Sequence, residues 1–308
     1  AEDIALFDNM FPGRLSVAFA RGYQNRWVQT LMQRGDGVSL INPESDRINR
    51  EIYDEHLEIV LKAWAEDSFN YKGKYVEIPY PYEGIPNWAG AEWTHAYGVG
   101  DEVDDAGTVY KVGVVPKPVT QPHPEICTVY TLSKKTLLDS AKRGFTSLAY
   151  ESRPEGFRQA CEEYREAARE AGHEVKLGER MGAVRCICIG DTYEQAFDLA
   201  ARSAAYEYHN YFNKFGMAEI FRTPADDPNT IVTFADERAC AQRLIEFGQI
   251  ICGTVDDVKR QIEDLRRCHA DGDLDWLIWE FFAQGNTTID EQRRQLELFS
   301  EKVLPSVQ

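Results

Sequence analysis

The chain has 308 residues, of which 43% are hydrophobic and 12% aromatic, and its formal net charge at pH 7 is −17. Such an acidic surface repels nucleic acid and anionic lipid, so we expect neither as a partner. No apolar stretch approaches the roughly 20 residues that a membrane-spanning helix needs, and we expect no signal peptide. The hydrophobic content is sufficient for one large α/β domain or two smaller ones.

The seven cysteines are odd in number and scattered in spacing. This pattern favours buried, reduced thiols in a cytoplasmic protein. Cys186 and Cys188 lie two residues apart on an expected strand and therefore point the same way. Because no histidine lies at ligand spacing from this pair, we expect no zinc site and no other metal site.

The first third of the chain alternates between predicted helix and strand. Apolar residues at helical spacing predict an opening helix that ends at Gly13. An apolar strand over 14–20 follows and leads directly into Arg21. A helix is predicted over 42–66, where an apolar stripe lies opposite acidic residues and Asn-Pro marks the start.

Residues 67–124 are irregular and rich in Tyr, Trp, Gly and Pro. The stretches "YKGKYVEIP" and "DEVDDAGTVYKVGVV" predict two short hairpins. The aromatic content is too high for a solvated linker. We therefore expect a packed excursion from the main fold.

The remainder alternates strands and helices. Strands are expected at 126–131, 145–150, 180–189 and 274–282, and helices at 133–143, 154–171, 192–214, 236–247, 254–267 and 288–303. Residues 216–235 are expected to form a polar loop with two prolines.

Repeated strand–helix units with apolar strands predict a parallel sheet covered by helices. Together with 14–20, the expected strands number five. They are compatible with strands four to eight of a (β/α)8 TIM barrel in a single domain over 1–308, with strands 1–3 missing from this chain. An open doubly wound sheet is the alternative.

Candidate binding residues follow two of the strands, where parallel α/β folds place their sites. Arg21 follows the first strand, and Ser133 and Thr136 stand where 126–131 meets its helix. Helix capping is the simpler interpretation of the two hydroxyls. The alternative is a phosphate site at the positive helix end, to which Arg50 would add a forked donor. Alone, Arg50 would be an ordinary solvated arginine.

Several common chemistries are not indicated. The chain contains no Walker-type phosphate loop and no G-x-G-x-x-G after a strand, which disfavours a dinucleotide fold. It contains no G-x-S-x-G elbow, which argues against a serine hydrolase. The stripe of aromatic residues over 206–212 could line a pocket, but helix packing explains it better. No residue stands out as a general acid or base, so the catalytic residues are unknown at this point.

Four segments resemble one family. "AEDIALFDNMFPGRLSVAFARGY" resembles the segment of bacterial luciferase-like flavin monooxygenases that leads into their fourth barrel strand. "SDRINREIYDEHLEIVLKAWAEDSFNYKGKYVEI", "VVPKPVTQPHPEI" and the C-terminal "GTVDDVKRQIEDL…TTIDEQRRQLELFSEKVLP" are similar to later parts of the same family. The resemblance covers nearly the whole chain, more loosely over 67–124 and 216–250.

This resemblance implies a binding site for reduced FMN (FMNH2). The positions that match its phosphate contacts are Arg21, Arg50, Ser133 and Thr136. The positions that would lie beside the flavin are Ala20, Gly22, Tyr23 and Leu132. Leu132 departs from the family, because luciferase has an acid just before the serine. The family's first three strands, which carry a catalytic histidine, are absent, so we expect the natural protein to be longer.

The function that the resemblance implies is FMNH2- and O2-dependent oxidation of a small organic substrate. A separate flavin reductase would supply the reduced flavin to a cytoplasmic homodimer. One alternative is a deazaflavin-dependent hydride-transfer oxidoreductase of the same fold, and another is a non-catalytic luciferase-like subunit. We expect 67–124 and 216–235 to form substrate-side walls and a lid.

Overall fold

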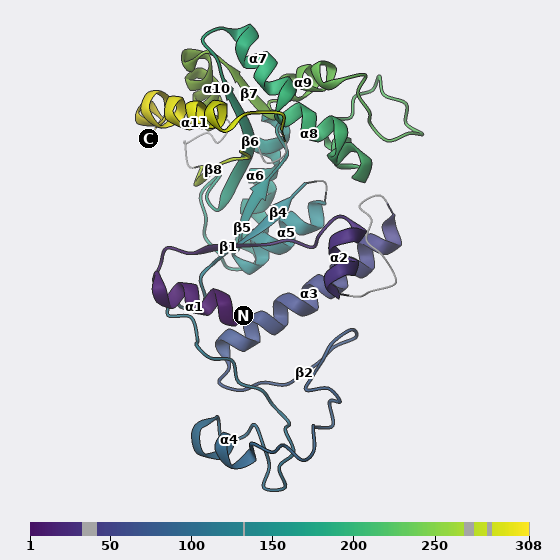
Figure 1. Cartoon of the computed structure of the whole chain (residues 1–308), viewed down its shortest axis with the longest axis vertical. Helices are drawn as coiled ribbons and strands as arrows, with labels where there is room; N and C mark the ends of the chain where they lie inside the picture. Colours follow the sequence, from purple (N-terminus) through teal and green to yellow (C-terminus); the bar gives the residue numbers. More distant parts are fainter. Residues whose placement is uncertain (33–41, 132, 268–273, 282–284, 308) are drawn as a thin grey trace. The chain divides into compact units, whose positions relative to one another are not determined.

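The computed structural model describes residues 1–32, 42–131, 133–267, 274–281 and 285–307. The chain divides into two compact units, Ala1–Ile126 and Cys127–Gln308 (elements labelled in Figure 1). None of the helices in the described ranges combines the length and the apolar composition that a membrane crossing requires. Leu132 lies outside the described residues.

The first unit contains the predicted opening helix, strand and long helix. The elements are α1 (Glu2–Met10), β1 (Ser16–Phe19), α2 (Asn25–Met32) and α3 (Pro43–Ala65). Helix α3 begins where its sequence predicts, because the Asn42 side chain accepts a hydrogen bond from Ser45 N at 3.0 Å and proline occupies the first turn. The short helix α2 was not predicted.

Buried polar contacts hold the parts of the first unit together. Asp8 is fully buried, and its carboxylate accepts hydrogen bonds from Thr120 N at 2.7 Å and Thr120 Oγ1 at 2.6 Å. The Lys117 ammonium donates to Ala63 O at 2.8 Å, near the end of α3. These bonds attach the segment before β4 (Glu125–Tyr130) to both α1 and α3.

The excursion contains both predicted hairpins. Strands β2 (Tyr71–Lys72) and β3 (Glu77–Ile78) pair antiparallel. The second turn brings Val103 and Val109 into an antiparallel bridge. Helix α4 (Ala91–Tyr97) lies between the hairpins and has no buried residue.

The second unit is built on a parallel sheet, as predicted. Its strands are β4, β5 (Thr146–Ala149), β6 (Met181–Ile189), β7 (Ile250–Gly253) and β8 (Trp276–Trp279). Strand β5 lies between β4 and β6, while β7 pairs with the C-terminal half of β6 and β8 with residues 182–185. Every residue of β6 is buried, which makes it the centre of this unit. The four-residue strand β7 was not predicted.

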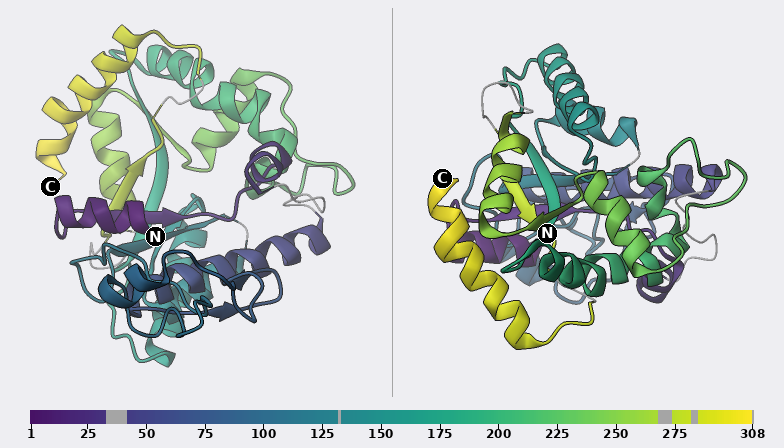
Figure 2. Two further views of the ribbon diagram at one scale, coloured as in Figure 1. Left: turned by 60° about the horizontal axis from the view of Figure 1, so that its bottom comes forward. Right: turned by 90° about the horizontal axis from the view of Figure 1, so that it is seen from above.

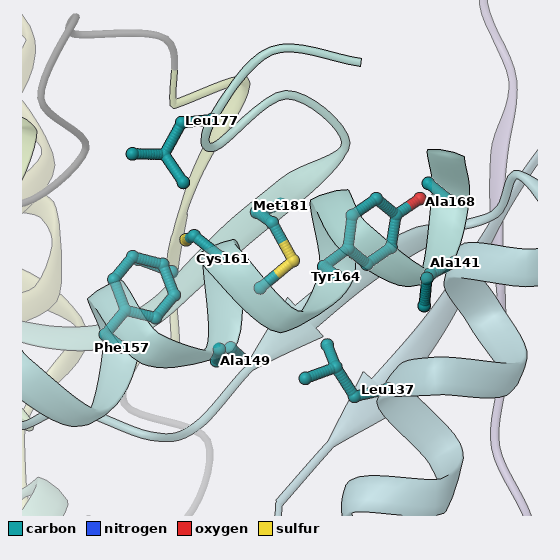
Figure 3. Packing of buried hydrophobic residues seen from close by; sticks show 12 residues of the cluster. Leu137, Ala141, Ala149, Phe157, Cys161, Tyr164, Ala168, Leu177 and Met181 are labelled. Carbon is teal, nitrogen blue, oxygen red and sulfur yellow. The ribbon is translucent and has the colours of Figure 1, made fainter. Parts of the chain in front are cut away.

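Helices cover this sheet and bury two apolar clusters. They are α5 (Lys134–Arg143), α6 (Pro154–Glu170), α7 (Tyr193–Arg202), α8 (Ala204–Asn210), α9 (Glu237–Glu246), α10 (Val255–Arg267) and α11 (Ile289–Leu298). Phe157, Tyr164 and Met181 belong to the cluster under α5 and α6 (Figure 3). A second cluster joins β6 and β7 to α10 and the C-terminal segment. Figure 2 shows the ribbons of these elements in two further views.

Two sequence predictions were wrong in detail. The expected helix over 192–214 is interrupted at Ser203, whose φ of −110° and ψ of −97° are not helical and whose hydroxyl donates to Leu199 O at 2.7 Å. The expected loop over 216–235 begins instead with a 3-10 helix, Met217–Phe221. Its apolar side chains are buried, so this part of the segment packs into the unit rather than facing solvent.

Candidate functional site

Arg21 and Arg50 converge on one carboxylate in the first unit. Arg21 Nη1 lies 2.6 Å from Asp46 Oδ1, and Arg50 Nη2 lies 3.4 Å from Asp46 Oδ2. Both guanidinium side chains are mostly buried, with exposures of 16% and 14%. Two cations and one anion leave this cluster with a net positive charge. The spacing of Asp46 and Arg50, one helical turn apart, was the sequence signal that could have revealed Asp46.

The turn after β1 is held in a specific conformation. Asn49, which is buried, donates through Nδ2 to Arg21 O at 3.1 Å and to Gly22 O at 3.3 Å. Gly22 has a φ of +76°, a conformation that residues with a Cβ rarely adopt. A Cβ there would also meet Val28 Cγ2 at 3.1 Å. The backbone that carries Arg21 is therefore fixed by α3.

A small pocket of about 210 Å³ opens beside Arg21. Phe19, Ala20 and Arg21 line it from the end of β1, and Asn49, Tyr53 and His56 are among the residues that line it from α3. Complete sites for drug-sized ligands are usually about 300–1,000 Å³, so this pocket can hold only part of a cofactor. Tyr23 lies at the start of α2, with its ring 5.3 Å from that of Trp27.

The other predicted phosphate contacts lie at the start of α5 in the second unit. Ser133 occupies the N-cap position but makes no side-chain cap bond to the helix, and its carbonyl accepts a hydrogen bond from Thr136 N at 2.9 Å. The first turn carries Lys134 and Lys135 and no acid. The backbone N–H groups make this helix end positive, while the ammonium groups of Lys134 and Lys135 pair with Glu163 and Asp139. The structure brings Arg21 and Arg50 together in one unit and places Ser133 and Thr136 together in the other.

The sequence reasoning missed a polar cluster in the second unit. Tyr150 directly follows β5 and Glu280 directly follows β8, so both lie at carboxyl ends of parallel strands. The Tyr150 hydroxyl donates to Glu280 Oε1 at 3.1 Å, and Cys186 Sγ donates to Glu280 Oε2 at 3.5 Å. Ligands bind at this edge of parallel sheets.

Two carboxyls, Glu280 of this cluster and Glu207, have raised pKa values. Burial raises the pKa of Glu280, and hydrogen bonds from Tyr150 and Cys186 offset only part of this effect. Burial and the nearby charge of Glu280 raise the pKa of Glu207, on α8, to about 7. No cationic side chain of the described residues lowers either pKa. The sequence signal for Glu280 was a charged residue directly after the apolar strand in "LDWLIWEFF". The same kind of signal singled out Arg21.

Comparison with known proteins establishes the family. The family model described as luciferase-like monooxygenase matches residues 93–272, which is more than half of the chain. The chain therefore belongs to the luciferase-like monooxygenase family. A search of curated proteins found no match.

Solved structures confirm the predicted fold class. The monooxygenase RslO1 from Streptomyces bottropensis is 18% identical with a TM-score of 0.65, and the match covers 99% of this chain and 72% of that one. The oxygenating constituent of 3,6-diketocamphane monooxygenase from Pseudomonas putida, solved in complex with FMN, is 21% identical with a TM-score of 0.65 and coverages of 99% and 74%. An F420-dependent secondary alcohol dehydrogenase is 15% identical with a TM-score of 0.63 and coverages of 100% and 74%. At these identities the likeness shows the α/β fold of luciferase-like barrels and no more.

Proposed function

We propose that the protein is a flavin-dependent monooxygenase that takes FMNH2 from a separate reductase and uses O2 to oxidise a small organic substrate. We further propose that it works in the cytoplasm as a homodimer. The observation that carries the proposal is the convergence of Arg21 and Arg50 on Asp46, beside a pocket at the end of β1. Reduced flavin, when bound, supplies the electrons that activate O2.

The residues present fit the phosphate of a flavin mononucleotide. A guanidinium has five N–H donors in a fork that matches phosphate oxygens, and Asp46 engages Arg21 through one nitrogen. Asp46 would hold both guanidiniums in place, so that little side-chain entropy is lost on binding. In the second unit, Ser133, Thr136 and the positive end of α5 are the further proposed phosphate contacts.

The other residues of the proposed flavin site have positioning roles. Ala20 lines the pocket, and the left-handed turn at Gly22 lets the backbone pass close to the ring system. Tyr23 would lie along the flavin. The excursion 67–124 would supply a substrate-side wall, and 216–235 a lid.

A deazaflavin enzyme is the second candidate. The structural likeness to an F420-dependent alcohol dehydrogenase favours it as the alternative. A deazaflavin transfers hydride and does not react with O2, so the two functions differ in cofactor and in oxygen consumption. A non-catalytic subunit would bind neither reduced cofactor.

Anaerobic titration of the full protein with FMNH2 and with reduced F420 tests these functions. Loss of a hydrogen bond to a charged group costs about 1.5–3 kcal/mol, so Arg21→Ala should weaken FMNH2 binding roughly tenfold to a hundredfold. Arg47→Ala is the matched control, because Arg47 is half exposed and, among the described residues, forms ion pairs with Glu44 and Glu51 on the same helix. Unchanged affinity in Arg21→Ala, or an equal loss in the control, would contradict the assignment. Tighter binding of F420 would favour the alternative.

A further inference from the structure

Glu207 is a buried carboxyl without a partner in the described part of the chain. Only 7% of the residue is exposed. Its side chain makes no hydrogen bond or ion pair with any described residue, and its electrostatic neighbour is another acid, Glu280. Buried carboxyls are almost always paired or hydrogen-bonded. An acid in this environment therefore needs a separate explanation.

The pair Glu207 and Glu280 has more acceptor positions than the protein uses. Two ionised carboxyls offer about eight lone-pair positions. Tyr150 and Cys186 fill one each on Glu280. If both acids were ionised, burying them without a cation would be costly. Without a ligand the pair consequently retains protons.

Glu280 of this pair directly follows a parallel strand, at the edge of the sheet where parallel α/β folds bind their ligands. Glu280 and Tyr150 are only partly buried, and both stand at the carboxyl edge of the sheet. Tyr208, the next residue of α8, packs edge-on against Phe212 and Phe221 at 5.2 Å and 5.4 Å. The surroundings of the pair are aromatic and carry no compensating positive charge.

We propose that Glu207 and Glu280 bind the primary ammonium group of a small organic molecule. An ammonium group supplies three N–H donors and one positive charge, which are the two properties that the pair lacks. That this molecule is the oxidised substrate rests on the proposed function, but the binding itself does not. A divalent cation is disfavoured, because the described residues hold no group of three or more metal-ligating side chains.

The ammonium would compete with protons. The titratable groups that face the pair are Tyr150 after β5, Cys186 on β6 and Tyr208 on α8, and burial and the acids raise the pKa of all three. These three groups stay neutral near pH 7, so the carboxyls alone exchange protons there. Binding should consequently release protons and tighten as the pH rises from 6 to 8, through the pKa of Glu207 near 7.

Isothermal calorimetry on the full protein tests the proposal, with phenethylammonium chloride as the probe and phenethyl alcohol as its neutral counterpart. We expect binding of the ammonium only, with proton release measured as a difference in heat between two buffers. Glu207→Gln and Glu280→Gln each keep the side-chain shape and should weaken binding at least tenfold. Glu194→Gln is the control, because Glu194 is an exposed acid of the same unit, on α7.

Three results would overturn the proposal. They are no ammonium binding at pH 8, equal binding of the alcohol, and equal loss of affinity in Glu194→Gln. Binding of MgCl2 with the same dependence on Glu207, in place of the ammonium, would also overturn it.

FMNH2 titration distinguishes this proposal from the proposed function. Glu207→Gln should retain its FMNH2 affinity. If the wild-type protein bound no reduced flavin, the proposed function would be contradicted but the ammonium site would not.

Discussion

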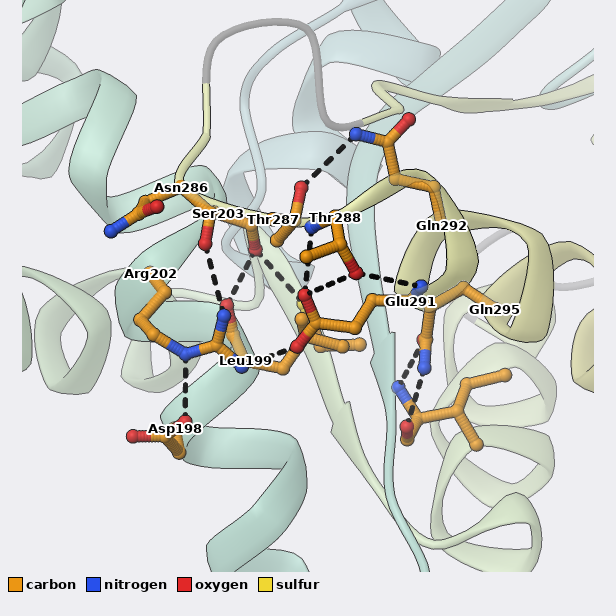
Figure 4. A network of polar contacts seen from close by, with 12 residues as sticks. Asp198, Leu199, Arg202, Ser203, Asn286, Thr287, Thr288, Glu291, Gln292 and Gln295 are labelled. Atoms are coloured by element: carbon orange, nitrogen blue, oxygen red, sulfur yellow. Dashed lines mark hydrogen bonds and ion pairs between the residues drawn. The ribbon is translucent and has the colours of Figure 1, made fainter.

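Gln295 on α11 completes the hydrogen bonding of the last residue of β6. Its Oε1 accepts from Ile189 N at 2.8 Å, and its Nε2 donates to Ile189 O at 2.7 Å (Figure 4). The side chain is buried, with 4% exposure. The amide thus takes the place of a neighbouring strand at this position.

Gln295→Ala should destabilise the second unit substantially. It removes the hydrogen-bond partners of both the N–H and the C=O of Ile189, and each unsatisfied buried group costs about 1–3 kcal/mol. Water that enters the vacated space can satisfy part of these groups, so we expect the free energy of unfolding to fall by about 2–4 kcal/mol. Gln292→Ala, one turn earlier on the same helix, removes one bond to Thr287 Oγ1 at a less buried position. Its effect should stay within about 0.5 kcal/mol.

Urea unfolding measures these changes, and amide exchange at Ile189 locates them. Gln295→Glu should destabilise the unit at least as much as alanine at neutral pH, because its buried carboxylate would face the Ile189 carbonyl with no proton to donate. Exchange at Ile189 should accelerate in Gln295→Ala and not in Gln292→Ala. Equal destabilisation by the two alanine variants would refute the reasoning.

Two further predictions concern the segment after the 3-10 helix Met217–Phe221. Hydrogen bonds from Arg243 and Thr223 lower the pKa of Asp226 to about 2. The ionised carboxylate therefore contributes its full stabilisation above the ordinary pKa near 4, and this stabilisation is lost as the pH falls through about 2. NMR titration should show this midpoint, and Arg243→Gln should raise it; a midpoint near 4 in the wild type would contradict the ion pair. Limited proteolysis should cut first within 222–236, which has no helix or strand, and FMNH2 should slow the cut. A first cut within α10 would argue against a lid.

The sequence predicted those elements whose hydrophobic pattern extends over many consecutive residues. Helix α3 was recognisable from its apolar stripe and its Asn-Pro start, and β6 from its mostly apolar run. Alternation of such segments sufficed to predict a parallel sheet. Arg21 was found because a charge directly after an apolar strand is unusual in a core, and Arg50 because it matches the family's phosphate contacts.

The elements and site residues that the sequence did not predict depend on contacts between residues distant in sequence. Strand β7 has only four residues, too few for a periodic pattern. The partners of Glu280 lie 130 and 94 residues away in sequence, and no local rule connects Tyr150 and Cys186 to it. Ser203 is an ordinary helix residue by propensity, and its break between α7 and α8 reflects the packing of both helices.

The buried thiols give the second unit a set of internal chemical reporters. The described cysteines are all buried, and they sit on β4, α6, β6, α9 and β7. Burial raises the pKa of Cys188, Cys240 and Cys252, which keeps these sulfurs unreactive while the fold is intact. A thiol reagent can therefore modify each of them only when its own element opens. The order of modification would rank the strands and helices of this unit by the free energy of local unfolding, without any engineered label.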